Sequence, residues 1–175
     1  MKHRIGEPNT ECRYPVHVAA GFIGEVFRWH GDWFAVEAGT GEETRHKGSR
    51  KDPGKEKAAA YLATRAGSGL ITPTAAPPVK DPQALAEPPL LHPRMKDNDE
   101  ARDAARAAIA FIGARGWTPI SGYPGSDNPW LVRCRCGTDV MRYWSHLRGR
   151  NGAEPSAHRH DGCTARDQAT APKTP

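Results

Sequence analysis

The sequence predicts an α+β protein made of two very small folded units joined by a Pro-rich linker. Leu, Ile, Val and Phe supply only 24 of the 175 residues, which is too few for one large, conventionally packed core. Gly and Pro occupy a further 18 and 16 positions and interrupt helices and strands. The net charge is only +5 and the Trp residues cluster in patterned segments, so full disorder does not fit either.

The first unit, residues 14–66, is predicted to be a three-stranded sheet followed by a helix. Alternation marks strands in the runs PVHVAA, GFIGEVFRW and DWFAVE, and it continues after the turn at Thr44, His46 and Gly48. Gly-rich turns separate the later runs. Ser49 can cap a helix over 55–65, where alanines and Leu62 recur. The aromatic residues of this β-β-β-α module are expected to fill a small core rather than to stack on a ligand.

Residues 67–95 are predicted to be a semi-rigid linker. Seven prolines lie between Ile71 and Met95, and the formal charge of the segment is zero. Such a composition favours extended polyproline II conformations and has no periodic apolar face. A second segment of low complexity, residues 167–175, is predicted to be a disordered tail.

The second unit, residues 96–166, is predicted to begin with a helix. Asp97 or Asn98 can cap it, acidic residues fill its first turn, and Gly113 or Gly116 can end it. Its apolar positions recur at helical spacing, but most of them are Ala. The helix therefore buries little volume, and the rest of the unit needs another source of stability.

Cysteines and histidines after this helix predict a zinc site of the Cys₃His type. Cys134 and Cys136 follow a short apolar strand, and the glycine after them permits a sharp turn. His160 and Cys163 supply a second pair at a spacing that zinc accepts. Thiolates and imidazole are borderline-soft donors that suit zinc. Four protein ligands leave no position for a catalytic water, so the predicted site is structural.

Three alternatives to this ligand set remain open. The clustered Cys and His residues can be unrelated surface and packing residues. His158 can take the place of His160. Cys12 is distant in the sequence but can replace a missing ligand, although an unpaired cytosolic thiol is its simpler interpretation.

The stretch 107–163 resembles a treble-clef zinc-binding repeat of uncharacterised proteins from high-GC bacteria and their mobile elements. The resemblance lies in a YPGS…PW…CG pattern after a helix, and it implies a treble clef with two ligand pairs. This chain tightens the first pair to C-x-C and has His160 where the family has Cys, which leaves a degenerate, metal-free copy as an alternative. The residues that match the treble-clef repeat are Gly116, Pro119, Ile120, Tyr123, Pro124, Gly125, Ser126, Pro129, Trp130, Cys136 and Gly137.

The N-terminal module is similar, by pattern alone, to integrase-arm modules.

Basic residues around the cysteines predict contact with nucleic acid, with DNA as the expected form. Residues 115–166 contain eight Arg and no Lys, and Arg suits bidentate contact with phosphate and guanine. The sequence pI near 9.2 agrees with an anionic partner, although high-GC coding also favours Arg over Lys. The predicted contacts in this unit are Arg133, Arg135, Arg142, Tyr143, Arg148 and Arg150. A secondary set in the first unit is Lys47, Arg50 and Lys51, for which a solvated surface is the alternative.

Several other functions are not expected. No set of acid, base and nucleophile is assembled, and no phosphate-binding glycine loop exists, so we expect neither an enzyme nor a small-molecule substrate. The mean hydropathy of −0.71, with no long apolar run and no secretory signal pattern, predicts a cytoplasmic protein without a membrane partner. The alternative to nucleic-acid binding is a non-enzymatic adaptor between proteins, in which the linker sets the separation of the two units.

Overall fold

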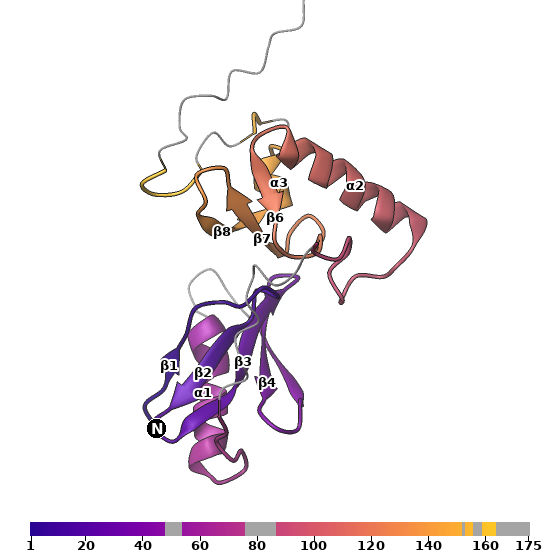
Figure 1. Cartoon of the computed structure of the whole chain (residues 1–175). Coiled ribbons are helices and arrows are strands. Elements are labelled where there is room, and N and C mark those ends of the chain that lie inside the picture. The colour runs from indigo at the N-terminus through magenta and orange to yellow at the C-terminus, as the bar shows by residue number, and fades with distance from the viewer. Residues whose placement is uncertain (48–53, 76–86, 152, 156–158, 164–175) are drawn as a thin grey trace, which may run out of the picture. The chain divides into compact units, whose positions relative to one another are not determined.

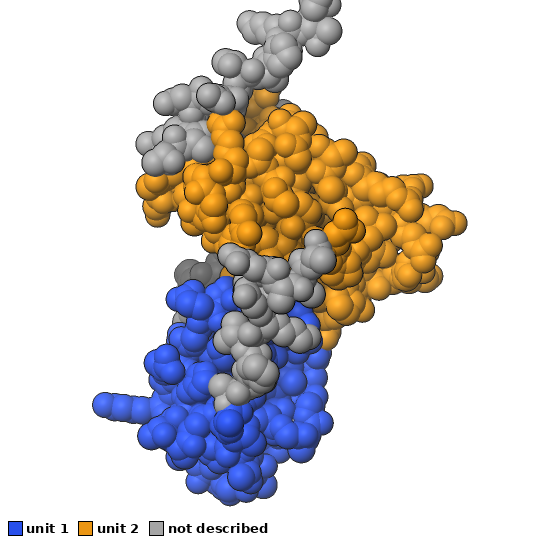
Figure 2. Space-filling view, in the orientation of Figure 1, with its two compact units in different colours: residues 1–84 blue, residues 85–175 orange. Residues whose placement is uncertain are grey.

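The computed structural model describes residues 1–47, 54–75, 87–151, 153–155 and 159–163. The chain divides into two compact units, Met1–Ala84 and Leu85–Pro175, which are coloured separately in Figure 2. Each unit combines helix with antiparallel sheet, so the predicted α+β class is confirmed. No helix in the described ranges is long and apolar enough to cross a membrane.

Unit 1 is an antiparallel sheet with one helix packed on a face of it (Figure 1). The strands follow one another in the order β1-β2-β3-β4-β5. The helix, α1 (Gly54–Gly67), contacts β2, β3, β4 and β5. The strands are β1 (Arg4–Ile5), β2 (Tyr14–Val18), β3 (Gly21–Trp29), β4 (Asp32–Glu37) and β5 (Glu43–His46).

The predicted number of three strands is wrong, because the sheet of unit 1 has five. The two additional strands are its edges. Strand β1 has only two residues and precedes residue 14, where the predicted module begins. Strand β5 contains Thr44 and His46, where the sequence pattern continues after the turn but does not mark a separate strand. Backbone pairing with a neighbouring strand defines both, through Arg4 opposite His17 and Thr44 opposite Ala35. Edge strands of this kind leave little trace in a hydropathy pattern.

The core of unit 1 lies between α1 and the sheet. Alanines and Leu62 on one side of the helix are fully buried against Val16, Ile23 and Val26 of the strands. Phe27 lies outside this cluster and stacks on Phe34, with ring centroids 5.3 Å apart. The core between helix and sheet therefore consists of aliphatic residues and alanine, with Trp33 packed against it as a partly buried residue, whereas the sequence predicts a core filled by aromatic residues. The predicted cap, Ser49, lies outside the described residues.

Both ends of the segment predicted to be a linker contact the folded units. Ile71 is buried in the core of unit 1, and the backbones of Thr74 and Phe22 exchange two hydrogen bonds of 2.9 Å. In unit 2, the amide of His92 donates to the Tyr123 carbonyl at 3.0 Å, beside a bridge between Leu91 and Tyr123. Backbone groups and single apolar residues make these contacts, so the Pro-rich composition conceals them.

The first helix of unit 2 is α2 (Asp99–Gly113), which ends at one of the two glycines predicted for that role. Of the two predicted caps, Asn98 is the one used, and its side chain accepts the Ala101 amide at 2.8 Å. Asp97 instead binds the guanidinium of Arg102. A three-stranded sheet of order β6-β7-β8 follows, with a short helix after it. These elements are β6 (Trp117–Pro119), β7 (Pro129–Cys134), β8 (Asp139–Tyr143) and α3 (Trp144–Leu147).

The core of unit 2 contains small side chains from the helix and large ones from the sheet. Ala105, Ala108 and Ile112 of α2 are fully buried. They belong to one cluster with Trp117 and Trp130, and Cys134 and Cys163 are members of that cluster too. Two of the predicted metal ligands therefore belong to the core of unit 2.

Candidate metal centre

The structure brings the four predicted ligands together. Cys134 ends β7 and is 1% exposed, Cys136 follows two residues later, and His160 and Cys163 come from the segment 159–163, here called the ligand arm. Each of the four residues offers one donor atom, a sulfur or a ring nitrogen, and these four atoms all lie within 4.8 Å of one another. The alternative ligand His158 lies outside the described residues, and Cys12 is buried in unit 1 and does not belong to this cluster.

Two glycine turns create the two ligand pairs. Gly137 has a φ of +92°, and its amide donates to the Cys134 carbonyl at 2.8 Å, which turns the chain sharply after Cys136. In the ligand arm, Gly162 has a φ of +70°, and the Cys163 amide donates to the His160 carbonyl at 3.2 Å. Positive φ costs little at glycine, so both turns form where the sequence places it.

The two sulfur–sulfur distances fit a tetrahedral metal ion. The Cys134 and Cys163 sulfurs are 3.7 Å apart, and those of Cys136 and Cys163 are 4.0 Å apart. A tetrahedral zinc ion with bonds of about 2.3 Å holds two sulfurs about 3.8 Å apart. The His160 Nε2 atom lies 3.0 Å from the Cys136 sulfur, which closes the set.

The imidazole of His160 is oriented as a metal ligand. Its Nδ1 atom lies 3.0 Å from the Asp161 carbonyl oxygen, a contact in which Nδ1–H donates. The proton on Nδ1 leaves the lone pair of Nε2 directed at the sulfurs. Metal-binding histidines commonly use their second nitrogen in this way, because the contact fixes both the tautomer and the ring.

The surroundings of the cysteines favour the thiolate form. Hydrogen bonds from the side chain and the backbone of Thr138 lower the pKa of Cys136 to about 6. Burial raises the pKa of Cys134, but hydrogen bonds from the Cys136 backbone and the Arg159 guanidinium outweigh it, and the net shift is downward. The thiolate is the form that binds a metal, and both downward pKa shifts favour that form.

The arginines predicted to contact nucleic acid lie in different environments. Arg135, Arg148 and Arg150 are exposed, and Arg150 lies 4.0 Å from a carboxylate oxygen of Asp127. Arg133 forms a two-pronged ion pair with Asp139, with distances of 2.7 and 2.9 Å. Three of the predicted arginines are therefore exposed at the surface of unit 2.

The other predicted contacts are less accessible or lie elsewhere. Arg142 is partly buried, and its guanidinium donates to the Arg159 carbonyl at 3.2 Å. The ring of Tyr143 is partly buried and lies against His146, with centroids 5.4 Å apart. In unit 1, Lys47 is exposed directly after β5. Arg50 and Lys51 lie outside the described residues.

Arg159 is a residue of the site that the sequence patterns did not single out. It is buried, and its Nε atom donates to the Cys134 sulfur at 3.1 Å. One signal for it exists in the sequence, namely its place directly before the ligand His160. The general abundance of arginine in this unit masks that signal.

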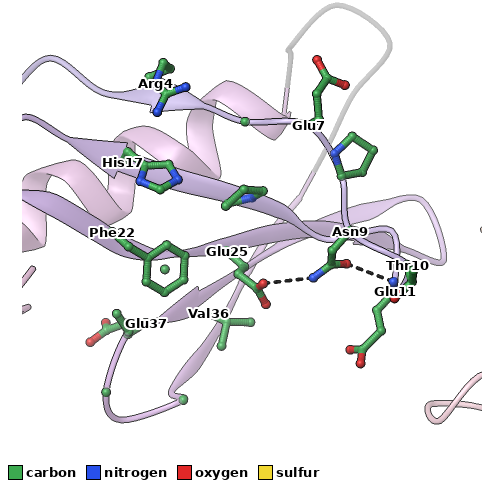
Figure 3. A pocket seen from close by; sticks show the side chains of 17 residues that line it. Arg4, Glu7, Asn9, Thr10, Glu11, His17, Phe22, Glu25, Val36 and Glu37 are labelled. Atoms are coloured by element: carbon green, nitrogen blue, oxygen red, sulfur yellow. Dashed lines mark hydrogen bonds between the residues drawn. The ribbon is translucent and has the colours of Figure 1, made fainter. Parts of the chain in front are cut away.

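Unit 1 contains a cavity of about 650 Å³ between the 6–11 loop, the sheet and the turn after β4 (Figure 3). Acidic side chains stand on its wall, but two of them already have cationic partners within the unit. Glu25 accepts from the Asn9 side chain at 3.2 Å and lies 3.7 Å from Arg13, and Glu37 is paired with Arg65. The chemistry for a ligand is therefore better developed at the Cys and His cluster.

Comparison with known proteins gives no family model, no curated relative and no solved structure that matches the chain. The residues of the metal centre and their surroundings are therefore the features that indicate a function.

Proposed function

We propose that unit 2 is a zinc-stabilised module that binds nucleic acid, with DNA as the expected ligand. The observation that carries the proposal is the convergence of the donor atoms of Cys134, Cys136, His160 and Cys163 within 4.8 Å. Three thiolates and one imidazole form a donor set that favours zinc over Mg²⁺ and Ca²⁺, because those two ions take oxygen ligands.

The proposed role of the zinc ion is structural. Four protein ligands complete a tetrahedral shell and leave no position for a reacting water. The face that α2 contributes to the core consists largely of alanine, so the helix adds little hydrophobic burial to this small unit. Metal binding free energy then becomes folding free energy.

The exposed arginines Arg135, Arg148 and Arg150 support contact with an anionic polymer. Arg135 stands between two proposed ligands, so the turn that binds the metal also fixes the position of its backbone. Guanidinium groups contact phosphates through two parallel hydrogen bonds, which suits a nucleic-acid backbone. Lys47 of unit 1 is a secondary contact in this proposal.

The treble-clef relationship is part of the same proposal. Three residues of the YPGS…PW…CG pattern have evident structural roles, which supports it. The rings of Tyr123 and Trp130 meet edge to face with centroids 5.3 Å apart, and Gly137 forms the turn after Cys136.

The metal part is tested by elemental analysis of the full-length protein purified without added metal. We expect one zinc per chain, and a loss of zinc in Cys134→Ser and in Cys163→Ser. Cys12→Ser is the matched control, because this cysteine is buried in unit 1. Absence of stoichiometric zinc from the wild-type protein would remove the basis of the proposal.

The nucleic-acid part is tested by titrating salt into a complex with duplex DNA. The slope of log K against log salt reports the number of phosphates contacted, and each contact contributes about 0.9 to it. Arg135→Gln, Arg148→Gln and Arg150→Gln should each lower the slope by about 1. Arg106→Gln is the control, since this exposed arginine of α2 is paired with Asp103. No retained DNA and no salt dependence would favour the protein adaptor instead.

A further inference from the structure

Arg159 links three separate segments of unit 2 through a single side chain. It is 7% exposed. Its Nε atom donates to the Cys134 sulfur at 3.1 Å, Nη1 to the Arg115 carbonyl at 2.9 Å, and Nη2 to the Gly116 carbonyl at 2.8 Å. The ligand arm is thereby joined to the end of β7 and to the connection between α2 and β6.

The charge of Arg159 has an unusual environment. A buried cation normally needs an anionic partner, because leaving water costs several kcal/mol. In the described part of the chain, no carboxylate forms an ion pair with this guanidinium, and two of its three hydrogen-bond partners are neutral carbonyls. The third partner, the Cys134 sulfur, is the atom that can carry a negative charge.

The metal centre supplies the missing negative charge. A divalent ion bound by three thiolates and a neutral imidazole has a net charge of −1, because three negative charges outweigh two positive ones. One guanidinium balances that charge. The neutralisation is most valuable here, since Cys134 is nearly inaccessible to water and charge interactions are strong in such surroundings.

Trp117 forms the wall behind the guanidinium. The carbon at the centre of the Arg159 guanidinium lies 4.4 Å from the centroid of this ring, which is 5% exposed. The guanidinium of Arg142 lies 5.8 Å from the same ring and donates to the Arg159 carbonyl at 3.2 Å. Side chain and backbone of Arg159 are both fixed, one residue before the ligand His160.

We infer that Arg159 is the positioning and charge-balancing residue of the metal centre, a role that rests on the proposed zinc site. Its guanidinium stabilises the Cys134 thiolate, and its fork holds the ligand arm against the rest of unit 2. Residues that contact metal ligands in this way contribute strongly to affinity, and their loss typically weakens metal binding by about 10–100-fold.

The test compares Arg159→Gln and Arg159→Lys with the wild-type full-length protein. Zinc affinity is measured by competition with a chromogenic chelator, and the pH at which half of the protein is loaded is measured at a fixed zinc concentration. We expect Arg159→Gln to lose about 10–100-fold in affinity. Its loading midpoint should move to higher pH, since the thiolate has lost a stabilising cation. Arg106→Gln should match the wild type in both measurements.

Arg159→Lys separates charge from geometry. Lysine keeps the positive charge but lacks the planar fork that reaches two carbonyls and a sulfur. We expect it to restore much of the pH midpoint and less of the affinity. The absorption spectrum of the Co²⁺-loaded variants checks that the coordination remains tetrahedral in each case.

The outcomes distinguish the proposed zinc site from the inferred role of Arg159. Wild-type protein that binds no zinc contradicts the proposed function itself. Wild-type protein that binds zinc, with Arg159→Gln unchanged in affinity and in pH midpoint, overturns the inference alone. If Arg159→Gln does not fold, the charge-balancing role is tested with Arg159→Lys and a folded Arg159→Met variant. The role is refuted if the pH midpoint of Arg159→Lys is no closer to that of the wild type than the midpoint of Arg159→Met is.

Discussion

Replacement of Trp130 by phenylalanine should destabilise unit 2 by about 2–4 kcal/mol. The indole is 0% exposed, and its Nε1–H donates to the Ser121 carbonyl at 2.9 Å. Phenylalanine removes this donor from a buried acceptor, which costs about 1–3 kcal/mol. The smaller ring also leaves a void beside Tyr123, which adds roughly 1 kcal/mol.

Hydrogen exchange read by mass spectrometry can resolve this loss by unit. In zinc-loaded protein, the opening free energy of amides in β6 and β7 should fall by the stated amount, while the amides of α1 should keep their protection. Trp29→Phe is the control, because that partly exposed side chain lies in unit 1. A change below about 0.5 kcal/mol in β7, or an equal change in α1, would refute the reasoning from burial.

Three further outcomes are expected. Gly24→Ala should destabilise unit 1 by about 1–3 kcal/mol or more in urea denaturation, because φ is +146° and an added Cβ would overlap the Val36 carbonyl oxygen; an unchanged midpoint would contradict this. Burial lowers the pKa of His46 below its ordinary value of 6.5, so the folded form binds the proton more weakly than the unfolded chain. The stability of unit 1 should therefore fall as the pH drops below 6.5, and His46→Gln should flatten that dependence between pH 7.5 and 5. Asn98→Ala should cost about 1 kcal/mol of unit 2 stability, measured by denaturation of the zinc-loaded protein, because the Ala101 amide loses its cap; a neutral result would show that the cap is dispensable.

Features with a short sequence range could be predicted to within a choice of two residues. Asn98 is one of the two predicted caps and Gly113 one of the two predicted helix ends, and both lie within one turn of the residues they serve. The ligand pairs are similarly local, since Cys134 and Cys136 share one turn, and His160 and Cys163 share another. Residue type and spacing contain this information, because both turns need only the few residues that form them.

Features that depend on distant partners could not be predicted. Arg159 contacts the carbonyl of Gly116, a residue 43 positions away, and nothing in its identity distinguishes it from an exposed arginine. Arg142 is a similar case, because its type and position predict contact with nucleic acid and give no sign that its guanidinium donates to the backbone of the ligand arm. The edge strand β1 likewise depends on its partner β2 rather than on its own two residues.

Removal of the metal with a strong chelator tests the structural role of zinc most directly. Hydrogen exchange should be followed in the full-length protein before and after chelation. If zinc supplies the folding free energy of unit 2, the amides of β6, β7 and β8 should lose their protection, while those of α1 and β3 in unit 1 should keep theirs. Readdition of one equivalent of zinc should restore the pattern. Unchanged protection in β7 of a protein shown to be free of metal would contradict the structural role of the site.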